Sequence, residues 1–218
     1  MTEVSSVPAA SGEKYVYLVR HAEPLLPDHV WRFIGARSNP PLSPDGIAQA
    51  QELTARFEHV RLSVVWSSGL ARSLQTAEIA AGLPAGAIRI EPRLREVDLG
   101  LWDGLSGPEI QERYPREYAE RESDLVEFRF PEGESFRELQ KRAVAGFTDL
   151  VKTSLQAGAD HTLAVAHKSA NRVILCHFLG LPLHQMFTIK QEYCAVTVLR
   201  AALDDGGRLR IRVEELAS

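Results

Sequence analysis

The residues of this chain that are best suited to chemistry are ionisable side chains placed directly after predicted β-strands. The apolar run at residues 15–19 has the length and composition of a strand buried on both faces, and it ends on Arg20 and His21. In open α/β sheets, ligands bind at the carboxyl ends of the strands. An Arg-His pair alone is weak evidence for a functional site, because polar residues often follow a strand. The residues that follow the other predicted strands must therefore be considered with it.

Three more predicted strands, at residues 62–66, 87–90 and 162–166, lead directly or through the next turn into polar residues. One of these residues, Arg72, lies near the amino end of a predicted helix, where a cation is unfavourable unless an anion lies close by. Because the carboxyl ends of parallel strands meet at one edge of a sheet, we expect these residues to converge. The expected set comprises Arg20, His21, Ser67, Arg72, Glu96 and His167.

Two imidazoles, two guanidiniums and one carboxyl are suited to the transfer of a phosphoryl group through a histidine. His21 would be the nucleophile, kept neutral because neighbouring cations lower its pKa. Arg20 and Arg72 would bind phosphoryl oxygens, and His167 in its protonated form would bind a third oxygen. Glu96 would give a proton to the leaving alkoxide and would then take one from the attacking water.

The elements that must position these residues alternate between strands and helices along the chain. Ser43 before Pro44, and Ser135 three residues before Glu138, are helix-start patterns, while residues 194–215 indicate a closing hairpin. The expected fold is α/β: a three-layer sandwich whose mixed, mostly parallel sheet has helices on both faces. The helix that begins after Ser43 is expected to present one face formed by Ile47, Ala50, Leu53 and Phe57.

Two segments are expected to shape the entrance to the site. The polar stretch at residues 105–131 is predicted to be a small helical cap inserted over one end of the sheet, and the loop at residues 24–41 is long and rich in aromatics, as lids are. Arg32 and Arg37 in that loop are candidates for binding an additional carboxylate or phosphate of the substrate. Lys168 is either a further cation beside the substrate or a solvated side chain, and the sequence leaves both open.

Composition and charge set the broad class of the protein. The 218 residues are 44% hydrophobic and carry a formal net charge of −4, which gives no reason to expect a nucleic-acid or anionic-membrane partner. With no signal-peptide pattern and no run of membrane-spanning length, we expect a cytoplasmic protein with a loosely ordered or disordered stretch at residues 1–13 and a single domain at residues 14–218. A homodimer is left open.

No metal or cofactor is expected from the sequence. The seven histidines show no paired spacing on one helix, and the two cysteines, Cys176 and Cys194, form no cluster and have the surroundings of reduced core residues. No phosphate-binding glycine loop precedes a predicted helix.

Four ordered motifs together resemble the histidine phosphatase superfamily, also called the phosphoglycerate mutase-like family, over about residues 14–200. They are LVRHAE at residues 18–23, SS at 67–68 with Arg72 and QTA at 75–77, LREVDLG at 94–100, and VAH at 165–167. The resemblance implies a phosphoglycerate mutase-like fold and a phosphohistidine on His21. It also implies a phosphate pocket of Arg20, Arg72 and His167, with Glu96 as the proton donor.

Further short segments resemble the smaller bacterial phosphatase branch that includes α-ribazole phosphatase-like proteins: Gly35 with residues 41–43, residues 133–135, and residues 171–172. The chain departs from the family pattern where Ala22 replaces a usual Gly and where Lys168 and Ser169 replace Gly-Gly. These departures remove no catalytic group, but they bear on the identity of the substrate.

The sequence therefore predicts a metal-independent phosphatase of the histidine acid type, a hydrolase that acts on a small phosphorylated metabolite through a phosphohistidine. The alternative is a cofactor-dependent phosphoglycerate mutase. Against it, the residues after Glu96 lack a mutase-like Tyr-Gly continuation, and the cap is short. A catalytically silent phosphate-binding protein is the third possibility, against which the complete set of candidate residues argues.

Overall fold

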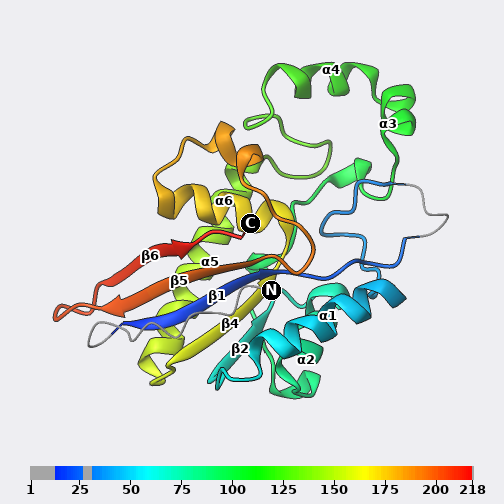
Figure 1. Ribbon diagram of the computed structural model, residues 1–218. Helices are drawn as coiled ribbons and strands as arrows, with labels where there is room; N and C mark the ends of the chain where they lie inside the picture. Colours follow the sequence, from blue (N-terminus) through cyan, green and yellow to red (C-terminus); the bar gives the residue numbers. More distant parts are fainter. Residues whose placement is uncertain (1–12, 27–30, 218) are drawn as a thin grey trace.

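The sheet that carries the candidate site has six strands in the order β3-β2-β4-β1-β5-β6 within residues 13–26 and 31–217, the part of the chain that the computed structural model describes (Figure 1). β1, β2, β3 and β4 are mutually parallel, while β5 is antiparallel to both of its neighbours. The sheet is thus mixed and mostly parallel, as predicted. Its strands are β1 (Lys14–Arg20), β2 (Val64–Ser67), β3 (Arg89–Ile90), β4 (His161–Ala166), β5 (Val196–Leu203) and β6 (Leu209–Glu215).

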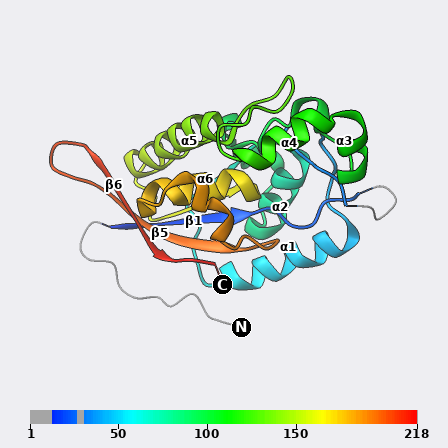
Figure 2. The ribbon, with the colours of Figure 1, turned by 90° about the horizontal axis from the view of Figure 1, so that it is seen from above.

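Helices cover both faces of the sheet and complete the three layers. α1 (Pro44–Phe57) and α2 (Ala71–Ala81) lie on one face, and α5 (Phe136–Gln156) and α6 (Lys168–Leu179) lie on the other (Figure 2). Short 3-10 turns connect these elements, namely η2 (Ala85–Ala87), η3 (Pro92–Leu94), η4 (Gly100–Trp102) and η5 (Leu183–Thr188).

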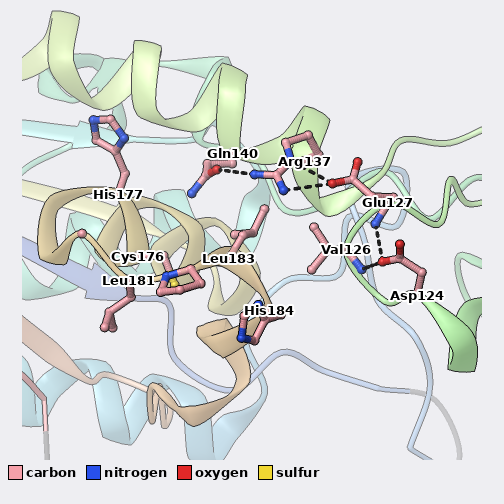
Figure 3. A pocket seen from close by; sticks show the side chains of 12 residues that line it. Asp124, Val126, Glu127, Arg137, Gln140, Cys176, His177, Leu181, Leu183 and His184 are labelled. Atoms are coloured by element: carbon pink, nitrogen blue, oxygen red, sulfur yellow. Dashed lines mark hydrogen bonds and ion pairs between the residues drawn. The ribbon is translucent and has the colours of Figure 1, made fainter.

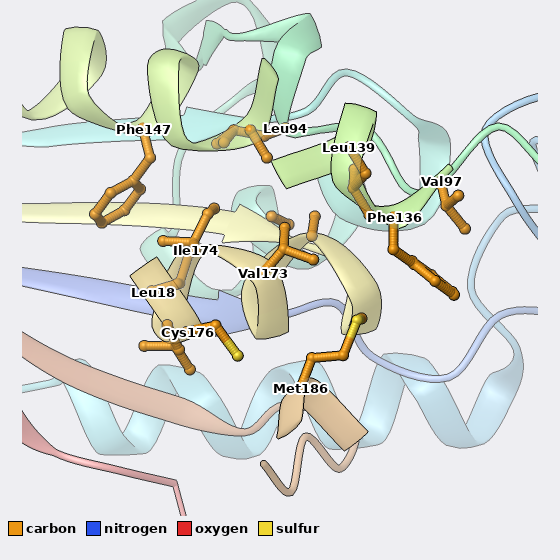
Figure 4. Packing of buried hydrophobic residues seen from close by; sticks show 14 of the residues in the cluster. Leu18, Leu94, Val97, Phe136, Leu139, Phe147, Val173, Ile174, Cys176 and Met186 are labelled. Carbon is orange, nitrogen blue, oxygen red and sulfur yellow. The ribbon is translucent and has the colours of Figure 1, made fainter. Parts of the chain in front are cut away.

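Alternate residues of the strands supply two hydrophobic cores, one on each face of the sheet. From β1, Val16 and Leu18 pack with α5 and α6, whereas Tyr17 and Val19 pack with α1 and α2. Successive strand side chains point to opposite faces, so a strand covered on both faces must be apolar throughout. Figure 4 shows the α5 and α6 side of this arrangement, with Leu18 beneath Ile174 of α6.

The predicted helix starts are confirmed, with one error in the predicted buried face. The hydroxyl of Ser43 accepts a hydrogen bond from Gly46 N at 2.9 Å, and Ser135 with Glu138 forms a reciprocal capping box. On α1, however, Ile47 is 43% exposed. Gly46 takes the inward position instead, because a Cβ there would lie 2.0 Å from the carbonyl oxygen of Glu23.

The segment predicted to be a cap forms two short helices, α3 (Gly107–Arg113) and α4 (Pro115–Ser123). They lie apart from the sheet, beside the loop that follows β1 (Figure 1). Main-chain hydrogen bonds join that loop to the base of the cap, since Phe33 and Leu105 pair at 2.9 Å. The fully buried ring of Trp102 lies among aromatic side chains of both segments: Phe33, Tyr114, Tyr118, Phe128 and Phe130.

Some predictions concern residues outside the described part of the chain. The expected disorder at residues 1–13 lies outside the described residues except for Glu13, whose carboxylate accepts a hydrogen bond from Arg212 at 3.0 Å. Residues 27–30 of the predicted lid also lie outside it. Among the described residues, no helix is both long enough and apolar enough to span a bilayer.

Candidate active site

Parallel pairing of β1 with β4 brings the two predicted histidines together. In the register of these strands Arg20 lies opposite Ala166, so the residues that follow, His21 and His167, leave the sheet side by side. The centroids of their rings are 4.9 Å apart. Neighbouring strand ends thus produce the convergence that the sequence predicts.

The imidazole of His21 is held in one neutral tautomer. Its Nδ1 lies 2.6 Å from the carbonyl oxygen of Ala22, and because a carbonyl only accepts, Nδ1 carries the hydrogen and Nε2 carries the lone pair. Burial, with the cations of Arg72 and Arg20, holds the pKa of His21 well below its usual value of 6.5. The ring is therefore uncharged at neutral pH, with a nitrogen free to attack phosphorus.

His167 is fully buried, and its Nε2 lies 2.7 Å from the hydroxyl of Ser68. Its Nδ1 has no hydrogen-bond partner in the described part of the chain. Burial and the positive charge of Arg72 lower the pKa of His167 well below 6.5. The surrounding cations thus favour the neutral ring, and a protonated His167 that binds a phosphoryl oxygen stays a prediction. An arriving phosphate dianion would favour the protonated form.

The guanidiniums of Arg20 and Arg72 are buried beside the histidines, and neither forms an ion pair within the described residues. Arg20 donates to the carbonyl of Gln191 at 2.6 Å and lies over the ring of Tyr193, and Arg72 donates to the carbonyls of Gly35 and Ser38. Neutral carbonyls orient these guanidiniums but do not cancel their charge. Burial lowers the pKa of Arg72 to about 10, so it stays charged at neutral pH.

Glu96 brings the carboxyl group to the same site. It is 7% exposed, and its two oxygens accept main-chain hydrogen bonds from Val97 at 2.9 Å and from Ser169 at 3.0 Å. Ser169 lies in the first turn of α6, directly after His167 and Lys168, so Glu96 is anchored next to the histidine pair. Its negative charge opposes the burial-induced lowering of the pKa of Arg20 and Arg72.

Among the other predicted residues, Ser67 takes a structural place. Its hydroxyl pairs with that of Ser73 at 2.7 Å and accepts from Gly69 N at 3.2 Å, which fixes the turn between β2 and α2. Ser68, which the predicted set omitted, contacts His167 instead. Both serines were visible in the sequence, but Ser67 ends β2 and Ser68 begins the turn after it, so only the fold shows which hydroxyl contacts His167.

The two lid arginines are engaged elsewhere. Arg32 donates to the carbonyl of Gly104 at 3.0 Å and to Glu109 at 3.2 Å, which fastens the loop to the base of the cap. The guanidinium of Arg37 pairs with Asp98 at 2.7 Å, and its side chain is 45% exposed. The structure does not bring either residue into contact with the histidine pair, because acidic partners in residues 98–109 hold them.

Lys168 lies at the rim of the site. It follows His167 and is partly buried, and burial together with the cations of Arg20 and Arg172 lowers its pKa. Its predicted place beside the substrate stays a prediction that this position supports.

Sequence reasoning missed the segment before β5. Its Gln191 and Tyr193 contact Arg20, and Tyr193 lies 5.9 Å from His21 between ring centroids. The side chain of Gln191 also accepts a hydrogen bond from Asn171 of α6 at 2.9 Å. This segment has no strand or helix periodicity, so no local sequence signal marks it.

The rest of the described chain offers no metal site but includes a further hollow. In residues 13–26 and 31–217 no group of three or more His, Cys, Asp or Glu side chains is arranged to hold a metal ion. A hollow between the end of the cap and the turn after α6, with His177 and His184 on its wall, shares no residue with the converging set (Figure 3). The histidine pair at the sheet edge is therefore the candidate active site.

Comparison with known proteins gives relatives that include bisphosphatases and a probable phosphoglycerate mutase. A 6-phosphofructo-2-kinase/fructose-2,6-bisphosphatase 4 of Homo sapiens is 32% identical over 178 residues, which cover 80% of this chain and 35% of that protein. The chain thus spans about a third of the length of such relatives. "Probable phosphoglycerate mutase GpmB" of Proteus mirabilis is 34% identical over 187 residues, covering 84% of this chain and 82% of that protein.

Solved structures share the fold over almost the whole chain. The α-ribazole phosphatase of Shigella flexneri superposes with a TM-score of 0.78 at 22% identity, covering 94% of this chain and 96% of its own. YhfR of Bacillus stearothermophilus gives a TM-score of 0.75 at 28% identity, with 94% and 98% covered. The fold is therefore the phosphoglycerate mutase-like α/β fold.

A family model described as "Histidine phosphatase superfamily (branch 1)" matches residues 16–212, which include every residue of the converging set. The chain belongs to branch 1 of the histidine phosphatase superfamily.

Proposed function

We propose that this protein is a phosphomonoesterase that hydrolyses a small phosphorylated metabolite through a phosphohistidine on His21. The observation that carries the proposal is a trio of buried nitrogen atoms around the neutral His21. They are Nε of Arg20, Nε of Arg72 and Nδ1 of His167, none of which has a hydrogen-bond partner among the described residues. A buried donor without a partner is costly, and a phosphoryl group would satisfy all three.

In the first step, Nε2 of His21 attacks phosphorus, the P–N bond forms and the P–O bond to the leaving alkoxide breaks. Arg20, Arg72 and His167 stabilise the negative charge on the phosphoryl oxygens. Glu96, in its carboxylic acid form, gives its proton to the departing alkoxide, which leaves as an alcohol.

In the second step, water attacks phosphorus and the P–N bond breaks, which releases inorganic phosphate and returns the lone pair to His21. The carboxylate of Glu96 takes the proton that the water loses. The carbonyl of Ala22 holds the hydrogen on Nδ1 throughout, so the same tautomer serves both steps.

The proposal leaves the metabolite to be identified. Solved relatives include a mycobacterial glucosyl-3-phosphoglycerate phosphatase, and curated relatives include fructose-2,6-bisphosphatases, whose names indicate small phosphorylated substrates. We propose Lys168 as the residue at the rim that contacts such a substrate. The similarity to GpmB keeps phosphoglycerate mutase activity as the second candidate.

The test is turnover of p-nitrophenyl phosphate without added metal, in the presence and absence of vanadate, followed by a screen over phosphorylated sugars, nucleotides, phosphoglycerates and ribazole phosphate. We expect vanadate-sensitive release of phosphate, acid-labile phosphate on the protein during turnover, and loss of both in His21→Ala. Conversion of 3-phosphoglycerate to the 2-isomer without phosphate release would identify a mutase instead. A well-folded wild-type protein with no turnover in the screen would contradict both activities.

A further inference from the structure

We propose that Arg142 of α5, together with Glu134, is a positioning residue that holds the proton donor Glu96 in place. This inference rests on the proposed function, since it concerns the step in which Glu96 gives its proton to the leaving group. Neither residue touches the histidine pair, so their effect on the reaction would pass through the main chain that carries Glu96.

The segment that carries Glu96 lacks regular structure. The turn η3 ends at Leu94 and η4 begins at Gly100, and between them neither helix nor strand hydrogen bonds fix the chain. The side chain of Glu96 itself accepts only main-chain hydrogen bonds, from Val97 and Ser169. The direction of its carboxyl group therefore depends on what fixes the backbone of residues 93–98.

Ala36 N donates to the carbonyl of Val97 at 3.0 Å, and one guanidinium binds three further carbonyls of this segment. Arg142 donates to the carbonyl oxygens of Arg93 at 2.8 Å, Arg95 at 2.9 Å and Glu96 at 2.8 Å. Its Nε donates to Glu134 at 2.9 Å, and Nη2 donates to the other oxygen of the same carboxylate. All five N–H donors of the side chain are thus used, a pattern that the three donors of a lysine cannot reproduce.

Glu134 fastens the other end of the same segment. Its Oε1 accepts a hydrogen bond from Asp98 N at 2.9 Å, and its own N–H donates to the carbonyl of Asp98 at 2.9 Å. The ion pair of Arg142 and Glu134 is partly buried, with side-chain exposures of 25% and 15%. The pair therefore grips the Glu96 segment at residues 93, 95, 96 and 98.

The helix that presents Arg142 lies unusually close to the segment. A Cβ on Gly146, one turn further along α5, would lie 2.8 Å from Cβ of Arg93. This close approach lets the guanidinium reach the three carbonyl oxygens of residues 93, 95 and 96. Arg142 is also near enough for its charge to help lower the pKa of His167, which places the pair beside the catalytic histidines without contact.

The test compares Arg142→Lys and Glu134→Gln with wild type over a series of esters from p-nitrophenyl phosphate to alkyl phosphates. A poor leaving group needs its proton, whereas nitrophenolate does not. The comparison uses kcat/KM, which reports the first step alone, because the second step and its use of Glu96 are the same for every ester. A donor displaced by about 1 Å costs roughly 100-fold, so we expect kcat/KM for alkyl phosphates to fall about 10- to 100-fold. For p-nitrophenyl phosphate we expect less than about a threefold loss in kcat/KM.

The matched control is Arg137→Lys, which alters another α5 arginine whose ion pair with Glu127 is exposed and whose side chain donates to Glu127 and Gln140. It should leave the leaving-group dependence of wild type unchanged. In a Glu96→Gln background, Arg142→Lys should lower the turnover of alkyl phosphates little further, because both changes act on one proton transfer.

Two outcomes would overturn the positioning role: equal losses for good and poor leaving groups, or a full additional loss in the Glu96→Gln background. If Arg142→Lys shows no cooperative thermal transition, Glu134→Gln, which preserves side-chain shape, decides the question by the same comparison. If Glu96→Gln loses the same factor of activity for good and for poor leaving groups, the acid role of Glu96 in the proposed function is contradicted instead. That result is distinguishable, because it does not involve residue 142.

Discussion

At the scale of single residues, the site is defined by the charge that surrounds two buried imidazoles. Arg20 and Arg72 donate hydrogen bonds to neutral carbonyls, and their positive charge acts on His21 and His167. Burial also lowers the pKa of both histidines, since burial and neighbouring cations each disfavour the charged imidazolium. The arrangement keeps His21 neutral and favours an anion close by, which is what the proposed attack on a phosphate ester needs.

This electrostatic arrangement predicts the pH dependence of activity. The pKa of His21 lies below 6.5, so the acid limb of kcat/KM should also lie below pH 6.5, where protonation of His21 removes its lone pair. Rates measured from about pH 4 to about pH 8 test this. In the Arg72→Gln variant the limb should move toward higher pH, because one cause of the lowered pKa is gone. A wild-type limb at or above pH 6.5 would contradict the assignment.

Stability should follow the same titration. The unfolded histidines have ordinary pKa values near 6.5, whereas folded His21 and His167 have lower ones. Between those values the unfolded chain binds more protons, so the free energy of unfolding should decrease as the pH falls below about 6.5.

At the scale of elements, irregular segments carry half of the site and regular elements hold them in place. The segment of Glu96 is bound by α5 through Arg142 and by the turn at residues 131–134. That turn approaches closely: a Cβ on Gly133 would lie 2.2 Å from the carbonyl oxygen of Asp98 and 2.8 Å from Gly100 N. Both are main-chain atoms, which cannot move without displacing the segment.

Gly133→Ala should therefore destabilise the fold by about 1–3 kcal/mol, the usual cost of overpacking, and lower turnover. Urea unfolding measures the first effect and phosphatase assays the second. The control is Gly86→Ala in η2, where nothing lies within 4 Å of the added Cβ and the change should stay within about 0.5 kcal/mol. Equal stability of the two variants would show that the turn adjusts without strain.

At the scale of the whole molecule, one sheet separates two hydrophobic cores. Leu18 of β1 belongs to the core beneath α5 and α6, and Leu163 of β4 belongs to the core beneath α1 and α2. Both are fully buried. Because adjacent strands of the same sheet contribute to both cores, we expect the two faces to unfold together.

Leu18→Ala and Leu163→Ala should each reduce the free energy of unfolding by about 2–5 kcal/mol, the range for deletion of a buried leucine. Ile47→Ala, at an exposed position of α1, should change it by no more than about 0.5 kcal/mol. For each of these three variants, unfolding followed by far-UV circular dichroism and by tryptophan fluorescence should give coincident transitions. Separate transitions would show that the two layers unfold independently.

The sequence by itself was enough to identify the candidate residues Arg20, His21, Glu96 and His167. Apolar runs and helix caps are local signals that locate the strand ends, and parallel topology brings those ends together. The layers of the fold followed from the same periodicities. The face of α1 was predicted less well, because the close approach of Gly46 to Glu23 depends on a distant segment.

Tertiary structure alone decided the details that govern the chemistry. Which of Ser67 and Ser68 reaches His167, and whether His167 is charged, depend on burial and on cations brought in from other strands and loops. The grip of Arg142 on three carbonyls likewise has no sequence pattern, because main-chain acceptors are the same for every residue. Local structural propensities depend on residues that are adjacent in the chain. Electrostatic fields and long-range hydrogen bonds depend on which residues, distant in the chain, come together in the fold.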